Sequence, residues 1–367
     1  MPIEQISIEK FLQLSEELPV LDVRSPGEYS HARIPGAFTL PIFNDLQRKT
    51  IGTAYKKESR EIAVNIGLNY FSERMKKVLP EANIILDQWR QGSENVDFSI
   101  PNGETGFLIH CWRGGMRSAT IAWLLSLYGH KTYVLEGGYK SFRNWVLGSF
   151  EKTYSFKILG GYTGSGKTEV LKEMRAKGEN IIDLEAIANH KGSAFGALGE
   201  APQPSQEMFE NLLAIQLWKN SHKTGATNND GQPKSYNEVI WLEDECRNIG
   251  TVNIPATLWN QMRDSPLYFL DIPHKKRLDH IVCVYGNFDK QSLEACILQI
   301  KKRLGGLETK NALDLLASDK RKDSFSILMN YYDKQYSRAL DDRENIQVLL
   351  NKIPAESVDI RNSSLLI

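Results

Sequence analysis

A cysteine at the end of an apolar run is followed by a loop rich in glycine and arginine. Residues 108–118 read LIHCWRGGMRS, which places Cys111 just before that loop and an expected helix just after it. Backbone N–H groups of a glycine-containing loop can turn inward, and a helix start adds unpaired amides and the positive end of its dipole. Such surroundings favour the nucleophilic thiolate. We therefore expect Cys111 to act in a pocket for a tetrahedral oxyanion or for a chalcogen delivered from one.

The spacing from Cys111 to Arg117 is C-x5-R. Cysteine phosphatases and long-loop sulfurtransferases share this layout, so the loop alone leaves both chemistries open. His110 is expected to pack or to hydrogen-bond behind the loop. The remaining cysteines lack the paired spacing of a zinc site, lie in or beside apolar stretches, and are expected in the core: Cys246, Cys283 and Cys296.

A second motif is typical of phosphate binding. Residues 161–168, GYTGSGKT, match G-x4-G-K-[ST], with an apolar run before them and an amphipathic helix after them. Successive amides of such a loop point at a diphosphate, the lysine adds a point charge, and the hydroxyl suits Mg²⁺. The motif leaves open which diphosphate is held and whether a phosphoryl group is transferred. The predicted diphosphate-binding residues are Gly161, Gly164, Ser165, Gly166, Lys167 and Thr168.

Phosphoryl transfer also requires a carboxylate that holds the metal. Two short apolar runs in the same half of the chain end in acidic residues. Asp183 follows one of them, and Glu243 and Asp244 follow the other. We expect one of these carboxylates to bind Mg²⁺ or to stand behind its ligands, with a salt bridge or a helix cap as the alternative role.

These motifs lie between alternating β and α patterns, which predict an α/β fold with parallel sheets covered by helices. The pattern restarts near residue 155 and becomes helical after residue 272. The expected domains are 1–150 with an insertion around 45–95, then 151–272, and a helical C-terminal part, 273–367, packed on the second domain. The expected strands are 19–23, 37–41, 106–110, 132–135, 156–159, 181–182, 239–242 and 267–270.

Composition adds limits on function. The 367 residues carry 45 Lys and Arg against 45 Asp and Glu, so contact with nucleic acid must come from local basic patches. Hydrophobic residues at 41% and charged residues at 25% exclude extensive disorder. The amino terminus lacks a signal-peptide layout, and no stretch reaches the roughly 18 apolar residues that span a bilayer. We expect a cytoplasmic protein without membrane contact.

Basic clusters in the expected insertion and in the helical tail are suited to RNA phosphates. A solvated helix face is the alternative for each cluster. The predicted RNA contacts are Lys56, Lys57, Lys275, Lys276, Arg277, Lys302 and Arg303.

The first half of the chain resembles a rhodanese domain, a class that carries sulfur as a cysteine persulfide. The resemblance rests on LDVR at 21–24, EY at 28–29, IPGA at 34–37, EGGY at 136–139 and Trp145. Ala32 and Arg33 stand where many rhodaneses have Gly-His. The 70 positions from Pro41 to Cys111 are too many for a compact rhodanese, so we expect the insertion to lie near the active face.

Nearly the whole chain resembles the tRNA 2-selenouridine synthase family, in which a rhodanese-like α/β domain precedes a P-loop NTPase-like α/β domain. The match extends to CWRGGMRS at 111–118, LEAIANHKGSAFG at 184–196, PSQ at 204–206, EDECRNIG at 243–250 and KRLGG at 302–306. The resemblance implies a transferase acting on wobble 2-thiouridine in a tRNA anticodon loop. Geranyl diphosphate first S-geranylates the base, and selenophosphate then supplies selenium as the geranylated sulfur leaves. Cys246 stands where the family is expected to have serine.

Under this resemblance Cys111 accepts or relays selenium, with Arg117 and Arg113 on the selenophosphate oxyanion. The phosphate loop holds the diphosphate of geranyl diphosphate as a leaving group. Three other interpretations stay open: a P-loop kinase with a regulatory rhodanese module, a cysteine phosphatase, and a non-catalytic tRNA-binding protein.

Overall fold

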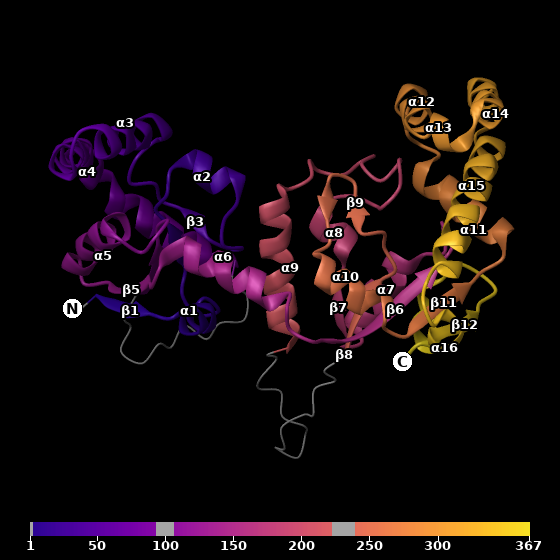
Figure 1. Cartoon of the computed structure of the whole chain (residues 1–367), viewed down its shortest axis with the longest axis horizontal. Coiled ribbons are helices and arrows are strands. Elements are labelled where there is room, and N and C mark those ends of the chain that lie inside the picture. Colours follow the sequence, from indigo (N-terminus) through magenta and orange to yellow (C-terminus); the bar gives the residue numbers. More distant parts are fainter. Residues whose placement is uncertain (1–2, 93–105, 222–238) are drawn as a thin grey trace, which may run out of the picture. The chain divides into compact units, whose positions relative to one another are not determined.

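The computed structural model describes residues 3–92, 106–221 and 239–367. The chain divides into two compact units, Met1–Gly148 and Ser149–Ile367. Each unit is built on a parallel sheet (Figure 1). Of the insertion expected around 45–95, residues 93–95 lie outside the described part. No helix among the described residues has both the length and the apolar character needed to cross a membrane.

The first unit is centred on β4 (Gly106–His110), in which every residue is buried. Its sheet runs in the order β1-β5-β4-β2-β3. Because β2 and β4 are parallel, Asp22 and His110 lie opposite each other at the same sheet edge, just before the cysteine loop. The other strands are β1 (Glu4–Ile6), β2 (Val20–Asp22), β3 (Phe38–Thr39) and β5 (Lys131–Leu135).

Helices of the first unit cover this sheet and carry the insertion. α3 (Asp45–Lys57) and α4 (Arg60–Gly92) form the insertion, and Phe71 and Ile85 of α4 pack into the same core as Ile109 of β4. The Asp45 carboxylate accepts a hydrogen bond from the backbone N–H of Gly27 at 3.0 Å, so α3 starts beside α2 (Pro26–His31). The remaining helices are α1 (Ile8–Leu14), α2 (Pro26–His31), α5 (Met116–Leu127) and α6 (Gly138–Ser149).

The second unit is centred on β6 (Ser155–Gly161), which leads into the phosphate loop and α7 (Lys167–Ala176). Its parallel sheet runs in the order β12-β11-β6-β8-β7. The other strands are β7 (Asn180–Ile182), β8 (Val239–Glu243), β11 (Leu267–Asp271) and β12 (Leu350–Pro354). The short pair β9 (Asn248–Ile249) and β10 (Val252–Asn253) and the helices α8 (Leu184–Ala188), α9 (Gln206–Ser221) and α10 (Ala256–Arg263) complete the α/β core.

The C-terminal part is helical over most of its length and has a hydrophobic core to which Phe195 of an earlier segment also belongs. Its helices are α11 (His274–Tyr285), α12 (Lys290–Gln299), α13 (Lys301–Leu304), α14 (Gly306–Ala317), α15 (Arg321–Asp341) and α16 (Ile346–Leu349), before the 3-10 helix η1 (Ile360–Leu365). The expected helical C-terminal part also contains one strand that the sequence does not predict, because β12 returns to the sheet and pairs with β11.

Arg277 of α11 connects this helical part to the phosphate loop through hydrogen bonds. Its guanidinium donates to the carbonyl of Thr163 at 2.9 Å and to both oxygens of Asp333 on α15, at 3.1 and 2.8 Å. Arg277 is only 3% exposed. The predicted RNA contact through Arg277 is therefore wrong, because the side chain is buried in a structural ion pair.

Candidate active sites

Cys111 lies at the floor of the loop that joins β4 to α5. The residue is 3% exposed, and its Sγ lies 3.2 Å from the hydroxyl of Ser118. Gly115 is the N-cap of α5, so the start of this helix forms the other wall of the loop. The thiol thus sits where the strand end and the helix dipole meet, as the sequence predicts.

A glycine in a tight position and a backbone hydrogen bond hold the loop in shape. Gly114 has a φ of +64°, and a Cβ at this position would lie 2.6 Å from the carbonyl oxygen of Leu135. The first amides of α6 close the loop from the other side, because Tyr139 N–H donates to the carbonyl of Cys111 at 2.8 Å. The EGGY sequence at 136–139 therefore shapes the cysteine loop.

The two arginines of the loop, Arg117 and Arg113, differ in how exposed they are. Arg113 is exposed, whereas Arg117 is half-buried and donates to the carboxylate of Glu28 at 3.0 Å. Burial acts to raise the pKa of Glu28, but Arg117 and the hydrogen bond from Ser25 outweigh it, so this pKa is lowered. Glu28 therefore holds Arg117 at the rim of the loop as a carboxylate.

A buried network lies behind the loop. Arg24 donates to both carboxylate oxygens of Asp22 and to the carbonyl of Ala32, and its guanidinium lies 3.8 Å from the ring centre of Tyr139. His110 stacks against Tyr139 at 6.2 Å between ring centres. The LDVR sequence at 21–24 thus supports the cysteine loop from below.

We expect His110 to stay neutral until the pH is well below 6. Burial lowers its pKa from 6.5 to about 4, although Asp22 opposes the shift. Between pH 6.5 and 4 the unfolded chain takes up a proton that the folded chain does not. The free energy of unfolding therefore decreases as the pH is lowered, by about 3 kcal/mol in total. NMR titration of the His110 ring checks this, and a midpoint near 6.5 would contradict it.

The phosphate loop has the backbone that its glycines predict. Gly164 and Gly166 have φ of +81° and +73°, a region that side chains rarely adopt. Lys167 Nζ donates to the carbonyl of Gly161 at 3.1 Å, so its charge lies across the loop. The hydroxyl of Thr168 donates to a carboxylate oxygen of Glu185 at 3.1 Å.

The acidic residues near the loop differ from the predicted set. Asp183 caps α8 by accepting from Ala186 N–H at 2.8 Å, and Asp244 accepts from the Tyr336 hydroxyl at 2.6 Å. Glu243 accepts from the backbone N–H of Glu185 at 2.8 Å and therefore stands behind that residue. Glu185, which lies in the LEAIANHKGSAFG motif and is not among the predicted metal-binding carboxylates, is the carboxylate that touches Thr168.

A metal ion would find oxygen ligands at this position. Mg²⁺ is often held by one or two protein oxygens together with substrate phosphates, and Thr168 with Glu185 offers such a pair. Among the described residues, no group of three or more His, Cys, Asp and Glu side chains is placed to hold a metal. Burial raises the pKa of Glu185 despite the attraction of Lys167, and burial together with Glu185 raises the pKa of Glu245 well above its usual range.

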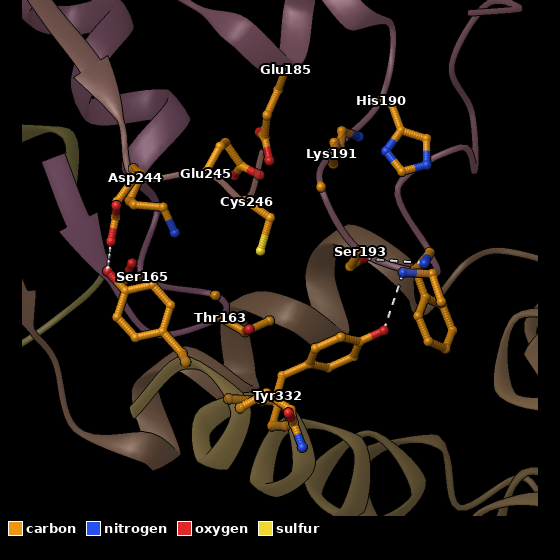
Figure 2. Close-up of a pocket in the computed structure, with 18 of the residues that line it drawn as sticks. Thr163, Ser165, Glu185, His190, Lys191, Ser193, Asp244, Glu245, Cys246 and Tyr332 are labelled. Atoms are coloured by element: carbon orange, nitrogen blue, oxygen red, sulfur yellow. Dashed lines mark hydrogen bonds between the residues drawn. The ribbon is translucent and has the colours of Figure 1, made fainter. Parts of the chain in front are cut away.

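The phosphate loop opens into a cavity of about 1300 Å³. Small-molecule sites commonly measure roughly 300–1,000 Å³, so this cavity has room for more than one substrate. Figure 2 shows Glu245 and Cys246 facing the cavity on one side and Tyr332 on the other. Cys246 and Cys283 are exposed, which corrects the expectation that they lie in the core, whereas Cys296 is buried as predicted.

One wall of this cavity is apolar and comes from the helical C-terminal part. Ile281 of α11 lies against the phosphate loop, because a Cβ on Gly164 would be 2.7 Å from its Cγ1. Tyr336 of α15 accepts from the backbone N–H of Gly161 at 3.4 Å. The apolar lining residues of this part include Ile281, Val284, Phe325, Leu328, Met329 and Leu340, and Phe195 adds to them from an earlier segment.

The predicted basic contacts take different positions. Lys302 and Arg303 line the cavity and are exposed. Lys275 and Lys276 are exposed at the start of α11, and Lys56 and Lys57 are exposed in the last turn of α3. All of these except the buried Arg277 are open to a polyanion.

The cysteine loop on one α/β unit and the phosphate loop on the other define a protein that joins a rhodanese-like domain to a P-loop domain. A family model described as tRNA 2-selenouridine synthase AAA domain matches residues 154–360, and the rhodanese-like domain model matches residues 7–144. The chain belongs to the tRNA 2-selenouridine synthase family. This confirms the resemblance and the fold class that the sequence predicts.

Curated relatives named tRNA 2-selenouridine synthase match along most of the chain. The protein from Pseudomonas syringae is 31% identical and covers 88% of this chain and 88% of its own length. The Shewanella frigidimarina protein is also 31% identical, covering 90% of this chain and 91% of its own. The Sulfurovum protein is 30% identical, with coverages of 88% and 89%.

Proposed function

We propose that this protein is a transferase that converts wobble 2-thiouridine of tRNA into 2-selenouridine in two steps. Geranyl diphosphate first alkylates the sulfur, and selenophosphate then replaces the geranylated sulfur with selenium. Family membership supports the overall conversion. The observation that carries the two-step route is the cavity in which a diphosphate loop adjoins an apolar wall.

In the first step the thiouridine sulfur attacks C1 of the geranyl group, the C1–O bond breaks, and diphosphate leaves. The loop amides and Lys167 stabilise the charge that develops on this leaving group. Mg²⁺ held by Thr168 and Glu185 would add further positive charge at the diphosphate. The phosphate loop thus assists departure of a diphosphate and requires no ATP hydrolysis.

Alkylation at sulfur also releases the N3 proton of the base, because the product has a C2–N3 double bond. Glu245 lines the cavity, and its carboxylate is the proton acceptor that we propose for this step. Lys302 and Arg303 line the same cavity and are suited to contact the tRNA backbone as the base enters.

The apolar wall is the part of the cavity that suits a prenyl chain. Leu328 and Met329 are almost completely buried and Val284 is half-buried, and all three line the cavity. Transfer of a hydrocarbon chain from water to such a surface is favourable in proportion to the apolar area covered. We place the geranyl chain against α11 and α15 with its diphosphate in the adjoining loop.

The exchange of Val284 for phenylalanine tests this placement. The larger ring takes up space along the apolar wall that a ten-carbon chain needs. We therefore expect the rate of alkylation by geranyl diphosphate to fall about tenfold relative to the rate with five-carbon dimethylallyl diphosphate. Steady-state alkylation of 2-thiouridine tRNA with each donor gives the ratio. Cys283→Phe, which places the same ring at an exposed position of α11, is the matched control. An unchanged donor ratio in Val284→Phe would count against the proposed site.

The second step is placed at the cysteine loop. Selenophosphate is a tetrahedral anion, and the loop offers the start of α5, Arg117 and the exposed Arg113 around Cys111. An alkylated sulfur is a better leaving group than a thiocarbonyl sulfur. This difference explains why alkylation precedes selenium entry. Geranylthiol is the expected by-product.

A further inference from the structure

The chemistry of selenophosphate limits what Cys111 can do. Selenium in this compound is bound to phosphorus and is already fully reduced. Formation of a sulfur–selenium bond on a cysteine would require an oxidant, and the proposed reaction supplies none. A route in which neither selenium nor phosphorus changes oxidation state must break the phosphorus–selenium bond by transfer of the phosphoryl group.

The groups around Cys111 suit phosphoryl transfer. Arg117 follows at the C-x5-R spacing, and Ser118 lies directly after it with its hydroxyl 3.2 Å from Sγ of Cys111. The same hydroxyl donates to the carbonyl of Gly115 at 3.0 Å. When Cys111 is a neutral thiol, its S–H therefore donates to the Ser118 hydroxyl. When Cys111 is a thiolate, the Ser118 hydroxyl can instead turn its proton toward the sulfur.

We propose that Cys111 accepts the phosphoryl group of selenophosphate and so releases hydrogen selenide for the tRNA base. This inference rests on the proposed function, in which selenophosphate is the selenium donor. The Cys111 thiolate forms a bond to phosphorus, the phosphorus–selenium bond breaks, and its electron pair leaves with selenium. Selenium takes the acidic proton of selenophosphate and departs as the hydrogen selenide anion. This anion is a weak base, so its departure needs no separate general acid.

The remaining steps also balance. The hydrogen selenide anion adds to C2 of the geranylated base, geranylthiolate leaves and takes a proton from water, and the selenium-bound proton passes to N3. Water then attacks phosphorus of S-phosphocysteine, the phosphorus–sulfur bond breaks, and phosphate and the Cys111 thiolate are restored. The start of α5 and Arg117 hold the phosphoryl oxygens in both phosphorus-centred steps.

Ser118 is the positioning residue of this cycle. A hydrogen bond from its hydroxyl stabilises the thiolate as a leaving group when S-phosphocysteine breaks down. Loss of that hydrogen bond in Ser118→Ala should slow breakdown and raise the steady-state amount of S-phosphocysteine about tenfold. Ser118→Thr keeps a hydroxyl and should restore the wild-type level.

The test uses the full chain and selenophosphate labelled with radioactive phosphorus, without tRNA. The reaction is stopped in alkaline denaturant, because S-phosphocysteine is labile in acid. We expect label on the peptide that contains Cys111, selenide release at least equal in amount to that label, more label in Ser118→Ala, and none in Cys111→Ser. Cys283→Ser, a change at an exposed cysteine outside the loop, should label like the wild type.

Phosphoryl and selenium adducts have nearly the same mass, so the selenium isotope pattern must be examined together with the label. Selenium on Cys111 without labelled phosphorus would overturn the inference. The inference would also be overturned if selenouridine forms from geranylated tRNA while Cys111 carries no label in either the wild type or Ser118→Ala. That result leaves the proposed function intact. Label on Cys111 with no selenouridine from geranylated tRNA would uphold the inference and refute the proposed function.

Discussion

Replacing Cys111 with serine should stop the reaction at S-geranyl-2-thiouridine. A serine hydroxyl is almost wholly protonated at neutral pH and is a far weaker nucleophile than a thiolate, so selenouridine formation should fall at least about a thousandfold. Alkylation should continue, because the cavity beside the phosphate loop is lined by residues of the second unit. Nucleoside mass spectrometry of digested tRNA measures both products.

Two comparisons make this result decisive. Cys283→Ser removes an exposed thiol outside the loop and should behave like the wild type. Serine at 111 is close in size to cysteine, so the buried floor of the loop should keep its fold. Selenouridine formed by Cys111→Ser at a rate near that of the wild type would exclude Cys111 as the nucleophile.

Replacing Lys167 with alanine should have the opposite outcome. The Lys167 ammonium lies across the phosphate loop at 3.1 Å from the carbonyl of Gly161. In the proposed first step this charge stabilises the leaving diphosphate. Removal of such a charge typically costs about a hundredfold to a thousandfold in rate. Thiouridine should therefore remain unmodified in the assay that contains both donors.

The Lys167→Ala variant should still act on tRNA that is already geranylated. Its cysteine loop belongs to the first unit and is unchanged, so selenouridine should form from geranylated tRNA at the wild-type rate. Lys219→Ala removes an exposed lysine of α9 and serves as the control for the loss of charge. Equal loss of both steps in Lys167→Ala would mean that the loop is needed for selenium entry as well.

The parts of the fold that sequence predicts best are strand, loop and helix units with a local signal. β4 is a buried, mostly apolar run that ends at His110, directly before Cys111, and β6 leads directly into the phosphate loop. Both strands and the helices after them therefore follow from neighbouring residues. The sequence pattern does not predict β1 or β12. Both are sheet-edge strands with exposed positions and lack a continuous apolar pattern.

The cavity is harder to predict because its walls come from distant parts of the chain. Phe195, Ile281 and Leu328 look like ordinary core residues in sequence, and only the folded chain brings them to the phosphate loop. Arg277 has the sequence context of a surface cluster, yet its pairing with Asp333 buries it. Glu185 gives no signal of its own, since its contact with Thr168 depends on where α8 begins.

The roles assigned to the cysteine loop and to the phosphate loop can be separated in a single transfer experiment. 2-Thiouridine tRNA is treated with Cys111→Ser and geranyl diphosphate, purified away from protein, and given to Lys167→Ala with selenophosphate. Two separable steps predict selenouridine in this sequence and none when the order of the variants is reversed. No selenouridine in either order, or equal amounts in both, would contradict the division of the reaction between Cys111 and the phosphate loop.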